Sequence, residues 1–235
     1  MFDLPYFIKA NRKENKKFRI KLLGDSITHG AGGTGFEQNG ENFVANVRRN
    51  LNGYCWANMF KDNLETNFGC EVINNGMYGT NVEGLIFHFE KIVDEEDDFI
   101  ICMIGTNNRH QYMKTGAKKS VEEMSETFYQ NLLTLHSMLE EKNKVHVFMA
   151  NIPAGKNNEQ DGVDYWRILH MSDINDIYKR AKKTAGFEFI SLYDLITAYM
   201  KEKGIEIDAL LADGLHPNDK GYDVMYELIR KEFNV

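Results

Sequence analysis

Five short apolar runs recur along the chain, separated by longer stretches whose apolar residues repeat with helical spacing. The runs are rich in Ile, Val and Phe, and their hydrophobicity is nearly continuous rather than alternating. This is typical of strands that are covered on both faces, as in a parallel sheet flanked by helices. The predicted strands are Phe18–Gly24, Glu71–Asn75, Asp98–Ile104, Lys144–Asn151 and Phe187–Leu192.

The stretches between these runs predict the covering helices. Ser120 followed by Glu123 indicates a helix start, and Ala185-Gly186 indicates a helix end. The predicted helices are Tyr54–Asn67, Val82–Val93, Val121–Glu141, Tyr165–Thr184 and Asp219–Phe233. Because strands and helices alternate and no linker or repeat divides the chain, we expect residues 1–235 to form a single α/β domain, a three-layer α/β/α sandwich with a five-stranded parallel sheet.

The composition is that of a folded, acidic protein. Hydrophobic residues make up 43% and charged residues 27% of the 235 residues, which predicts one sizeable core. The formal net charge of -7 argues against a nucleic-acid partner. No apolar run reaches the roughly 18 residues of a membrane span, and the basic cluster Lys9–Lys21 precedes too short an apolar stretch for a secretory signal. Cys55, Cys70 and Cys102 lie in or beside apolar stretches, which predicts buried free thiols and a cytoplasmic location.

The first predicted strand ends at Gly24 and is followed by Asp25 and Ser26. A hydroxyl at the carboxyl end of a strand can be held where open α/β sheets place their ligands, so Ser26 is a candidate nucleophile. The alternative is that Ser26 or Thr28 simply caps the following helix, which is the ordinary use of these residues. The C-terminal part of the chain favours the nucleophile because it carries the base that a serine requires.

That base is His216, in the segment Asp213–His216. An imidazole is suited to take the proton of a serine hydroxyl because it titrates near neutral pH. Asp213 lies three residues before it and can reach the ring nitrogen that faces away from the serine, which selects the useful tautomer. Pro217 and Asn218 then predict a rigid loop that enters a capped helix.

An acyl-transfer site also needs hydrogen-bond donors for the oxyanion. Gly79 follows the second predicted strand and can bring its backbone N–H close to a ligand because no Cβ intervenes. Asn107 follows the third strand and offers a side-chain amide. All these groups lie at carboxyl ends of predicted strands or in the loop after the last one, where parallel sheets place their sites.

Taken in order, these motifs resemble the GDSL-type, or SGNH, hydrolase family of esterase- and lipase-like acylhydrolases. The family is recognised by a Ser block near the N-terminus, a Gly block, an Asn block and a terminal Asp-x-x-His block. The matching residues are Gly24-Asp25-Ser26-Ile27, Gly79, Gly105-Thr106-Asn107-Asn108 and Asp213-Gly214-Leu215-His216. The resemblance covers nearly the whole chain and implies a flavodoxin-like SGNH-hydrolase fold.

The resemblance also implies a role for each residue. Ser26 would be the nucleophile, His216 the base and Asp213 its orienting partner. The backbone amides of Ser26 and Gly79 and the side chain of Asn107 would form the oxyanion hole.

Two residues depart from the family's pattern. Ile27 stands where the family has Leu, an exchange of apolar residues that should alter packing and little else. Asn108 stands where the family usually has Asp, which removes a charge and bears on how the Asn107 loop is supported.

Other site types fit the sequence less well. The segment Gly30–Gly35 matches the dinucleotide fingerprint G-x-G-x-x-G, but it begins too far beyond the strand and no acidic residue closes a second strand about 20 residues on. His29, His110 and Asp25 lack metal-ligand spacing, so we expect neither a metal nor a cofactor. A binding module that has lost turnover and an acyltransferase with the same triad remain alternatives.

The expected activity is hydrolysis of a small acyl ester through an acyl-enzyme on Ser26. An O-acetylated carbohydrate is the preferred substrate because mixed aromatic and polar loops suit sugar rings; a short-chain lipid or thioester is the alternative. We expect the substrate to contact Asp25, His29, Tyr78, Asn108, Arg109 and His110. Further residues in or beside the same loops are Asn39, Asn42, Trp56, Tyr112, Tyr165 and Trp166. No sequence signal points to a particular oligomeric state.

Overall fold

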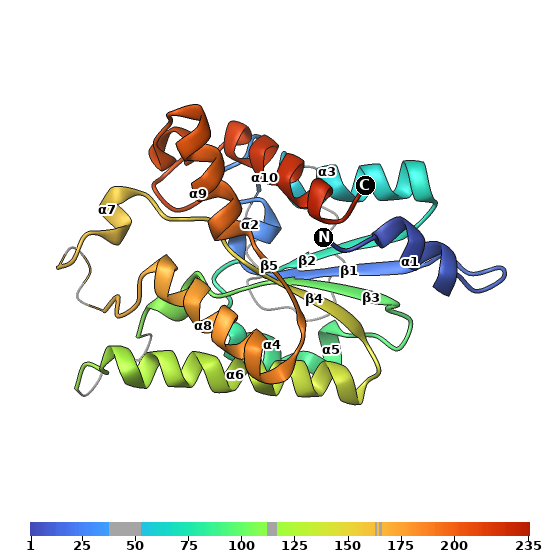
Figure 1. Cartoon of the computed structure of the whole chain (residues 1–235), viewed down its shortest axis with the longest axis horizontal. Coiled ribbons are helices and arrows are strands. Elements are labelled where there is room, and N and C mark those ends of the chain that lie inside the picture. Colours follow the sequence, from blue (N-terminus) through green and yellow to red (C-terminus); the bar gives the residue numbers. More distant parts are fainter. Residues whose placement is uncertain (38–52, 112–116, 163, 165) are drawn as a thin grey trace.

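A computed structural model describes residues 1–37, 53–111, 117–162, 164 and 166–235. Within them, parallel strands form a five-stranded sheet in the order β2-β1-β3-β4-β5 (Figure 1). The strands are β1 (Arg19–Gly24), β2 (Glu71–Gly76), β3 (Phe99–Met103), β4 (Val145–Ala150) and β5 (Glu188–Ser191). Each agrees with its predicted run to within about one residue at either end, so the predicted parallel sheet is confirmed.

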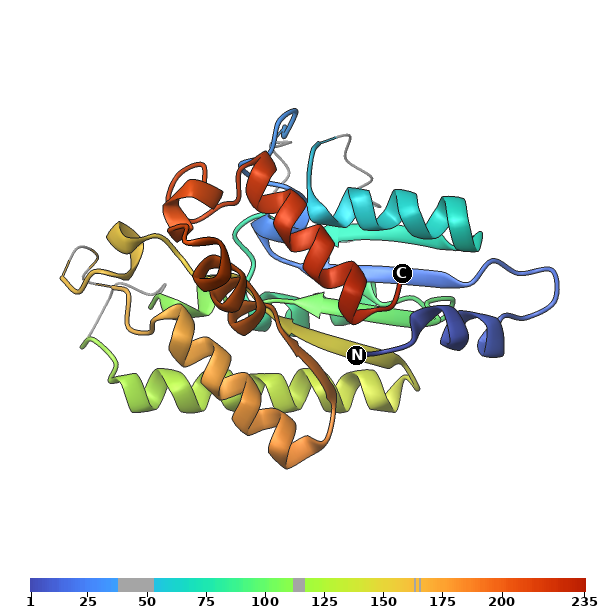
Figure 2. The same ribbon diagram turned by 45° about the horizontal axis from the view of Figure 1, so that its top comes forward.

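Helices cover both faces of the sheet, which explains why the strands are apolar on both sides (Figures 1 and 2). In β1, Leu22 belongs to the hydrophobic cluster of one face and Leu23 to that of the other. The first cluster includes α1 (Leu4–Asn11), α3 (Trp56–Phe68), α9 (Leu192–Lys203) and α10 (Asp219–Glu232). The second includes α4 (Val82–Phe87), α5 (Phe89–Ile92), α6 (Val121–Glu141) and α8 (Met171–Ala185). The three-layer α/β/α fold is therefore confirmed.

Helix α6 has the predicted bounds, and it begins at Val121 because its first turn closes a capping box. The Ser120 hydroxyl accepts from the Glu123 backbone N–H at 3.1 Å, and the Glu123 carboxylate accepts from the Ser120 N–H at 2.7 Å. Two donors that the first turn would otherwise leave unpaired are satisfied in this way.

Two predicted helices are wrong in extent. The helix expected over Val82–Val93 breaks at His88, whose backbone (φ -97°, ψ 8°) separates α4 from α5. The helix expected over Tyr165–Thr184 begins only at Met171, where the Asp173 carboxylate accepts from the His170 N–H at 2.7 Å. Helix α9 was not predicted because its first apolar residue, Leu192, continues the apolar run of β5, and α1 was also missed.

Shorter elements complete the described chain: α2 (Ser26–His29), η1 (Asn107–Arg109), α7 (Lys156–Glu159) and η2 (Ile207–Leu210). Cys55, Cys70 and Cys102 are buried and form no disulfide, as expected. In the part of the chain that the structure describes, no helix combines the length and apolar content needed to cross a membrane.

Candidate active site

Ser26 is the first residue of the short helix α2, directly after the carboxyl end of β1. The turn is tight, because a Cβ on Gly24 would lie 2.5 Å from the Met103 carbonyl oxygen and 2.2 Å from the Thr28 hydroxyl. Asp25 caps α2 by accepting from the Ile27 N–H at 3.0 Å. The cap is therefore Asp25 and neither Ser26 nor Thr28, which leaves the Ser26 hydroxyl available for another partner.

That partner is His216. The Ser26 Oγ lies 2.9 Å from His216 Nε2, and His216 Nδ1 lies 2.7 Å from Asp213 Oδ2. Ser26 is only 4% exposed and the His216 side chain 12%, whereas the Asp213 side chain is 57% exposed. The three side chains form a continuous hydrogen-bonded chain from an exposed carboxylate to a recessed hydroxyl.

The loop that carries His216 is held by its own backbone. The Ala212 N–H donates to the His216 carbonyl oxygen at 2.8 Å, and Leu211 pairs with Pro217 in an antiparallel bridge. Gly214 has φ +82°, a conformation that side chains other than glycine rarely adopt. Asp213 is therefore locked beside the ring by local structure as well as by its bond to it.

Asp213 is an ionised acceptor at neutral pH. Partial burial raises its pKa, but hydrogen bonds from the backbone N–H and ring of His216 and from the Leu215 N–H outweigh burial and hold the pKa below its usual range. A carboxylate at Nδ1 requires the neutral imidazole to carry its proton there. The lone pair is then on Nε2, facing the Ser26 hydroxyl.

Gly79 and Asn107, two of the predicted oxyanion donors, lie in turns that hydrogen bonds connect to the Ser26 turn. Gly79 has φ +73°, and a Cβ there would meet no atom within 4 Å, so the space on that side of the residue is open. The Asn107 amide donates one hydrogen to the Thr80 carbonyl oxygen at 2.7 Å, which ties it to the Gly79 turn and leaves its second hydrogen for a ligand. The Met77 N–H in turn donates to the Gly24 carbonyl oxygen at 2.8 Å, which joins this turn to the Ser26 turn.

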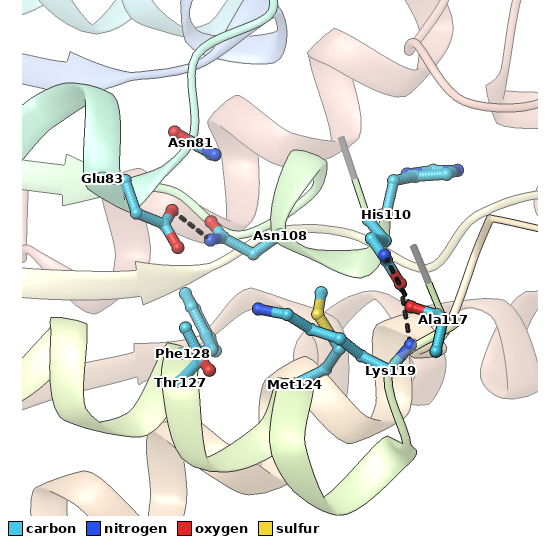
Figure 3. Close-up of a pocket in the computed structure, with 10 residues that line it drawn as sticks. Asn81, Glu83, Asn108, His110, Ala117, Lys119, Met124, Thr127 and Phe128 are labelled. Atoms are coloured by element: carbon cyan, nitrogen blue, oxygen red, sulfur yellow. Dashed lines mark hydrogen bonds between the residues drawn. The ribbon is translucent and has the colours of Figure 1, made fainter. Parts of the chain in front are cut away.

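Asn108 supports this arrangement through both ends of its amide. Its Oδ1 accepts from the Val82 N–H at 3.1 Å, and its Nδ2 donates to Glu83 at 2.8 Å (Figure 3). An aspartate at this position could accept the first bond but would place a second carboxylate against Glu83. Asn108 therefore suits this position better than the family's Asp, because the neighbouring Glu83 carboxylate needs a hydrogen-bond donor.

The predicted substrate-contacting residues fall into two groups. Asp25, His29, Asn108 and Arg109 are at most 5% exposed and lie beneath the site. Tyr78 is half-buried, and its ring stacks on His216 with centroids 5.9 Å apart and planes at 20°. His110 is also partly exposed and pairs with Asp164 at 3.0 Å. Tyr78 and His110 are therefore partly open to solvent, whereas the other four are not, and of the two Tyr78 contacts His216.

Of the other loop residues named from the sequence, Trp56 is fully buried in the core and Trp166 is half-buried. Asn39, Asn42, Tyr112 and Tyr165 lie outside the described residues.

Two residues that sequence reasoning missed hold the site from below. Asn151, at the end of β4, donates to the buried Asp25 carboxylate at 2.9 Å and to the Thr106 hydroxyl at 2.5 Å. Glu159 binds the fully buried Arg109 guanidinium at 2.9 Å. Burial raises the pKa of Asp25, while hydrogen bonds from Ile27, Thr106 and Asn151 act in the opposite direction. A motif search finds neither residue because their partners are distant in sequence.

The glycine-rich segment after α2 packs against protein. A Cβ on Gly32 would lie 2.4 Å from the Pro217 carbonyl oxygen, and one on Gly33 would lie 1.9 Å from the Tyr54 carbonyl oxygen. Gly32 thus allows this segment to pack closely against the His216 loop and Gly33 allows it to pack against Tyr54, so packing within the protein explains both glycines.

A cavity of about 480 Å³ lies between the Asn108 turn and the first half of α6 (Figure 3). Polar groups of Asn81, Glu83 and Asn108 line one side, and Met124 and Phe128 of α6 line the other. The cavity borders Asn108, the residue that follows Asn107.

Comparison with known proteins agrees with this geometry. The model of the GDSL-like Lipase/Acylhydrolase family matches residues 22–224. No curated protein matches the sequence.

Among solved structures, a mutant of Axe2, an acetyl-xylooligosaccharide esterase from Geobacillus stearothermophilus, is 20% identical with a TM-score of 0.70, over 95% of this chain and 97% of that one. LAE5, an alpha/beta hydrolase from the metagenome of Lake Arreo, Spain, is 20% identical with a TM-score of 0.68, over 92% of this chain and 95% of that one. At these identities the structural likeness shows the fold.

Proposed function

Because this chain belongs to the GDSL-like lipase/acylhydrolase family and is thus a carboxylic ester hydrolase, we propose that it hydrolyses small acyl esters through an acyl-enzyme on Ser26. The observation that carries the proposal is the hydrogen-bonded chain from Ser26 Oγ through His216 to Asp213, with distances of 2.9 and 2.7 Å. These are the distances at which a base takes a hydroxyl proton and a third group orients the base.

In the first half of the reaction, Ser26 Oγ attacks the acyl carbon while its proton passes to His216 Nε2. Asp213 stabilises the imidazolium that forms, because its carboxylate is ionised and in contact with Nδ1. The carbonyl oxygen becomes an oxyanion that receives hydrogen bonds from the backbone amides of Ser26 and Gly79 and from Asn107. When the tetrahedral intermediate collapses, His216 returns the proton to the leaving alcohol.

In the second half, a water molecule attacks the acyl-Ser26 ester. His216, neutral again, takes one proton from this water, and the same three donors stabilise the second oxyanion. Collapse breaks the bond to Ser26 Oγ, which recovers its proton from His216 and releases the carboxylic acid. An alcohol in place of the water would make the same site an acyltransferase.

An O-acetylated carbohydrate is the substrate that we propose. The half-buried ring of Tyr78 stacks with both His216 and Phe36, and its exposed part can contact a sugar ring. Asn81 and His110 are among the polar side chains that line a cavity on the other side of Asn108, and they can bind hydroxyl groups. The acetyl-xylooligosaccharide esterase of the same fold supports the same substrate class.

Active-site labelling tests the nucleophile. A fluorophosphonate probe followed by peptide mass spectrometry should label Ser26, and Ser26→Ala should abolish both labelling and hydrolysis of p-nitrophenyl acetate. Ser137→Ala, at an exposed position of α6, is the matched control and should behave as wild type. Near-wild-type hydrolysis by Ser26→Ala would refute the mechanism.

A series of p-nitrophenyl esters and acetylated xylooligosaccharides tests the substrate. We expect kcat/KM to be highest for acetyl and to fall as the acyl chain lengthens. If kcat/KM instead rises for acyl chains longer than butyrate, the substrate is a lipid ester rather than an acetylated carbohydrate. The Ser26 mechanism would still stand in that case.

A further inference from the structure

The end of the molecule opposite Ser26 carries a second cluster of titratable side chains. His136 and Glu140 lie one helical turn apart near the end of α6, and His146 is the second residue of β4. Ser26 follows the carboxyl end of β1, whereas His146 pairs with Ile100 at the amino-terminal end of this parallel sheet (Figure 1). The cluster is therefore separate from the proposed catalytic site.

The two imidazoles point at each other. His136 Nδ1 lies 2.9 Å from His146 Nε2, and His146 Nδ1 lies 2.8 Å from the Lys144 carbonyl oxygen. A carbonyl oxygen can only accept, so His146 carries a proton on Nδ1. When His146 is neutral, its Nε2 lone pair is directed at His136, with the tautomer set by a backbone partner, as is usual for metal-bound histidines.

We propose that His136, Glu140 and His146 bind a divalent transition-metal ion of the Zn²⁺ type. One ligand atom from each residue lies within 4.8 Å of the others, and no other such group of three was found among the described residues. Two imidazole nitrogens and a carboxylate are a ligand set that Zn²⁺ accepts, with a fourth position for water. The proposal is independent of the ester-hydrolase function.

To receive the ion, the two imidazoles must separate slightly and turn so that both lone pairs point at it. Two nitrogens bound to tetrahedral Zn²⁺ at about 2.05 Å lie about 3.3 Å apart, so the imidazoles must separate by about 0.4 Å. His136 is half-buried and can make this shift, and its ring proton must lie on Nε2 for Nδ1 to bind the ion. The Glu140 carboxylate lies 3.8 Å from His146 Nδ1, and because its side chain is 64% exposed it can rotate toward the ion on the Nε2 side.

His146 is buried, and its Nδ1 is taken by the Lys144 carbonyl oxygen, so Nε2 is the nitrogen that it presents to the ion. A surface cavity of about 490 Å³, lined by these three residues together with Asn143 and Glu188, gives solvent and the ion access.

The ion would tie the end of α6 to the start of β4. Because binding to the folded state alone stabilises it, Zn²⁺ at about 100 times its Kd should raise the Tm of a protein of this size by roughly 5–10 °C. Ester hydrolysis should not require the ion, since the cluster lies at the other end of the sheet.

Calorimetric titration of metal-free, tag-free protein with Zn²⁺ tests the site. We expect one ion per chain in the wild type and at least about 10- to 100-fold weaker binding in His136→Gln and Glu140→Gln, because losing a ligand costs at least as much as losing a supporting partner. Glu141→Gln, the exposed neighbour of Glu140, is the matched control and should bind as wild type. The Tm increase with Zn²⁺ should disappear in the same two variants.

A separate variant distinguishes this cluster from the proposed catalytic residues, which also contain a histidine and a carboxylate. Zn²⁺ binding should survive in His216→Gln. If binding is lost in His216→Gln but kept in His136→Gln, the ion binds at the catalytic end and the proposal is overturned. Equal binding in all variants, or no saturable binding to the wild type, would also overturn it.

Discussion

The exchange Asp213→Asn changes one atom and should nearly abolish activity, because the backbone dictates how the new amide lies. Asp213 Oδ1 accepts from the Leu215 N–H at 3.0 Å and from the His216 N–H at 2.8 Å. Only the carbonyl oxygen of an asparagine can replace that acceptor. Its NH₂ group must then take the place of Oδ2, 2.7 Å from His216 Nδ1.

An NH₂ group in that place donates to His216 Nδ1 and so forces the ring proton onto Nε2. The nitrogen that faces Ser26 then carries a hydrogen and cannot take the hydroxyl proton. Loss of the correct tautomer in a serine triad lowers kcat by about 10⁴-fold, which corresponds to about 5.4 kcal/mol of transition-state stabilisation. Packing should change little because the two side chains are nearly the same size.

Steady-state hydrolysis of p-nitrophenyl acetate at neutral pH measures the effect. Asp208→Asn, at an exposed carboxylate of η2, is the control and should keep wild-type kcat. Circular dichroism should show both variants folded. A loss of less than about 10-fold in a folded Asp213→Asn would mean that the loop alone orients His216, and the argument from tautomers would fail.

Four further outcomes are expected. Asn107→Ala should lower kcat by about 10²- to 10³-fold with little change in KM, as for loss of an oxyanion donor, measured with p-nitrophenyl acetate. In Gly79→Ala the new methyl group meets no neighbour, but φ +73° is unfavourable for alanine and should strain the backbone by about 1–2 kcal/mol, which urea unfolding would measure. Relaxation of this strain should move the Gly79 amide and so lower kcat. Glu159→Gln leaves the buried Arg109 charge without its carboxylate and should reduce unfolding free energy by about 3 kcal/mol in urea. The pKa of Asp213 is lower in the folded than in the unfolded state, so its carboxylate stabilises the fold above the unfolded pKa of about 3.9. This stabilisation is lost as the pH falls through the folded pKa. Between about pH 5 and about pH 3, the Tm of the wild type should therefore fall more than the Tm of Asp213→Asn.

The sheet could be predicted from the sequence because strands that are buried on both faces are nearly continuous apolar runs. The start of helix α6 was predictable, since Ser120 and Glu123 satisfy each other within one turn. The break at His88 was not predictable, because the apolar spacing continues through α4 and α5. Apolar periodicity records which side chains are buried and does not record where the backbone leaves helical geometry.

The contacts of the candidate site were likewise predictable only in part. The Asp213–His216 contact spans three residues and can be proposed from spacing alone. Ser26 and His216 are 190 residues apart, so they were paired by the need of a serine for a base and by the family resemblance rather than by spacing. The Asn151 bond to Asp25 spans 126 residues and no motif pointed to it. The pairing of His136 with His146 spans ten residues, but it depends on how the turn after α6 places β4.

Ser26 is available as a nucleophile because of its neighbours Gly24 and Asp25. A serine at the start of a helix ordinarily accepts from a backbone N–H, and that bond would hold its oxygen away from a base. Here Asp25 makes the cap one residue earlier, and Gly24 allows the turn to pass within contact distance of Met103. The buried Asp25 carboxylate, which Asn151 holds, therefore caps the helix. The Ser26 hydroxyl bonds to His216 instead. Replacing Asp25 with a residue that cannot cap should therefore lower activity by drawing Ser26 toward the backbone, even though Asp25 itself is buried beneath the site.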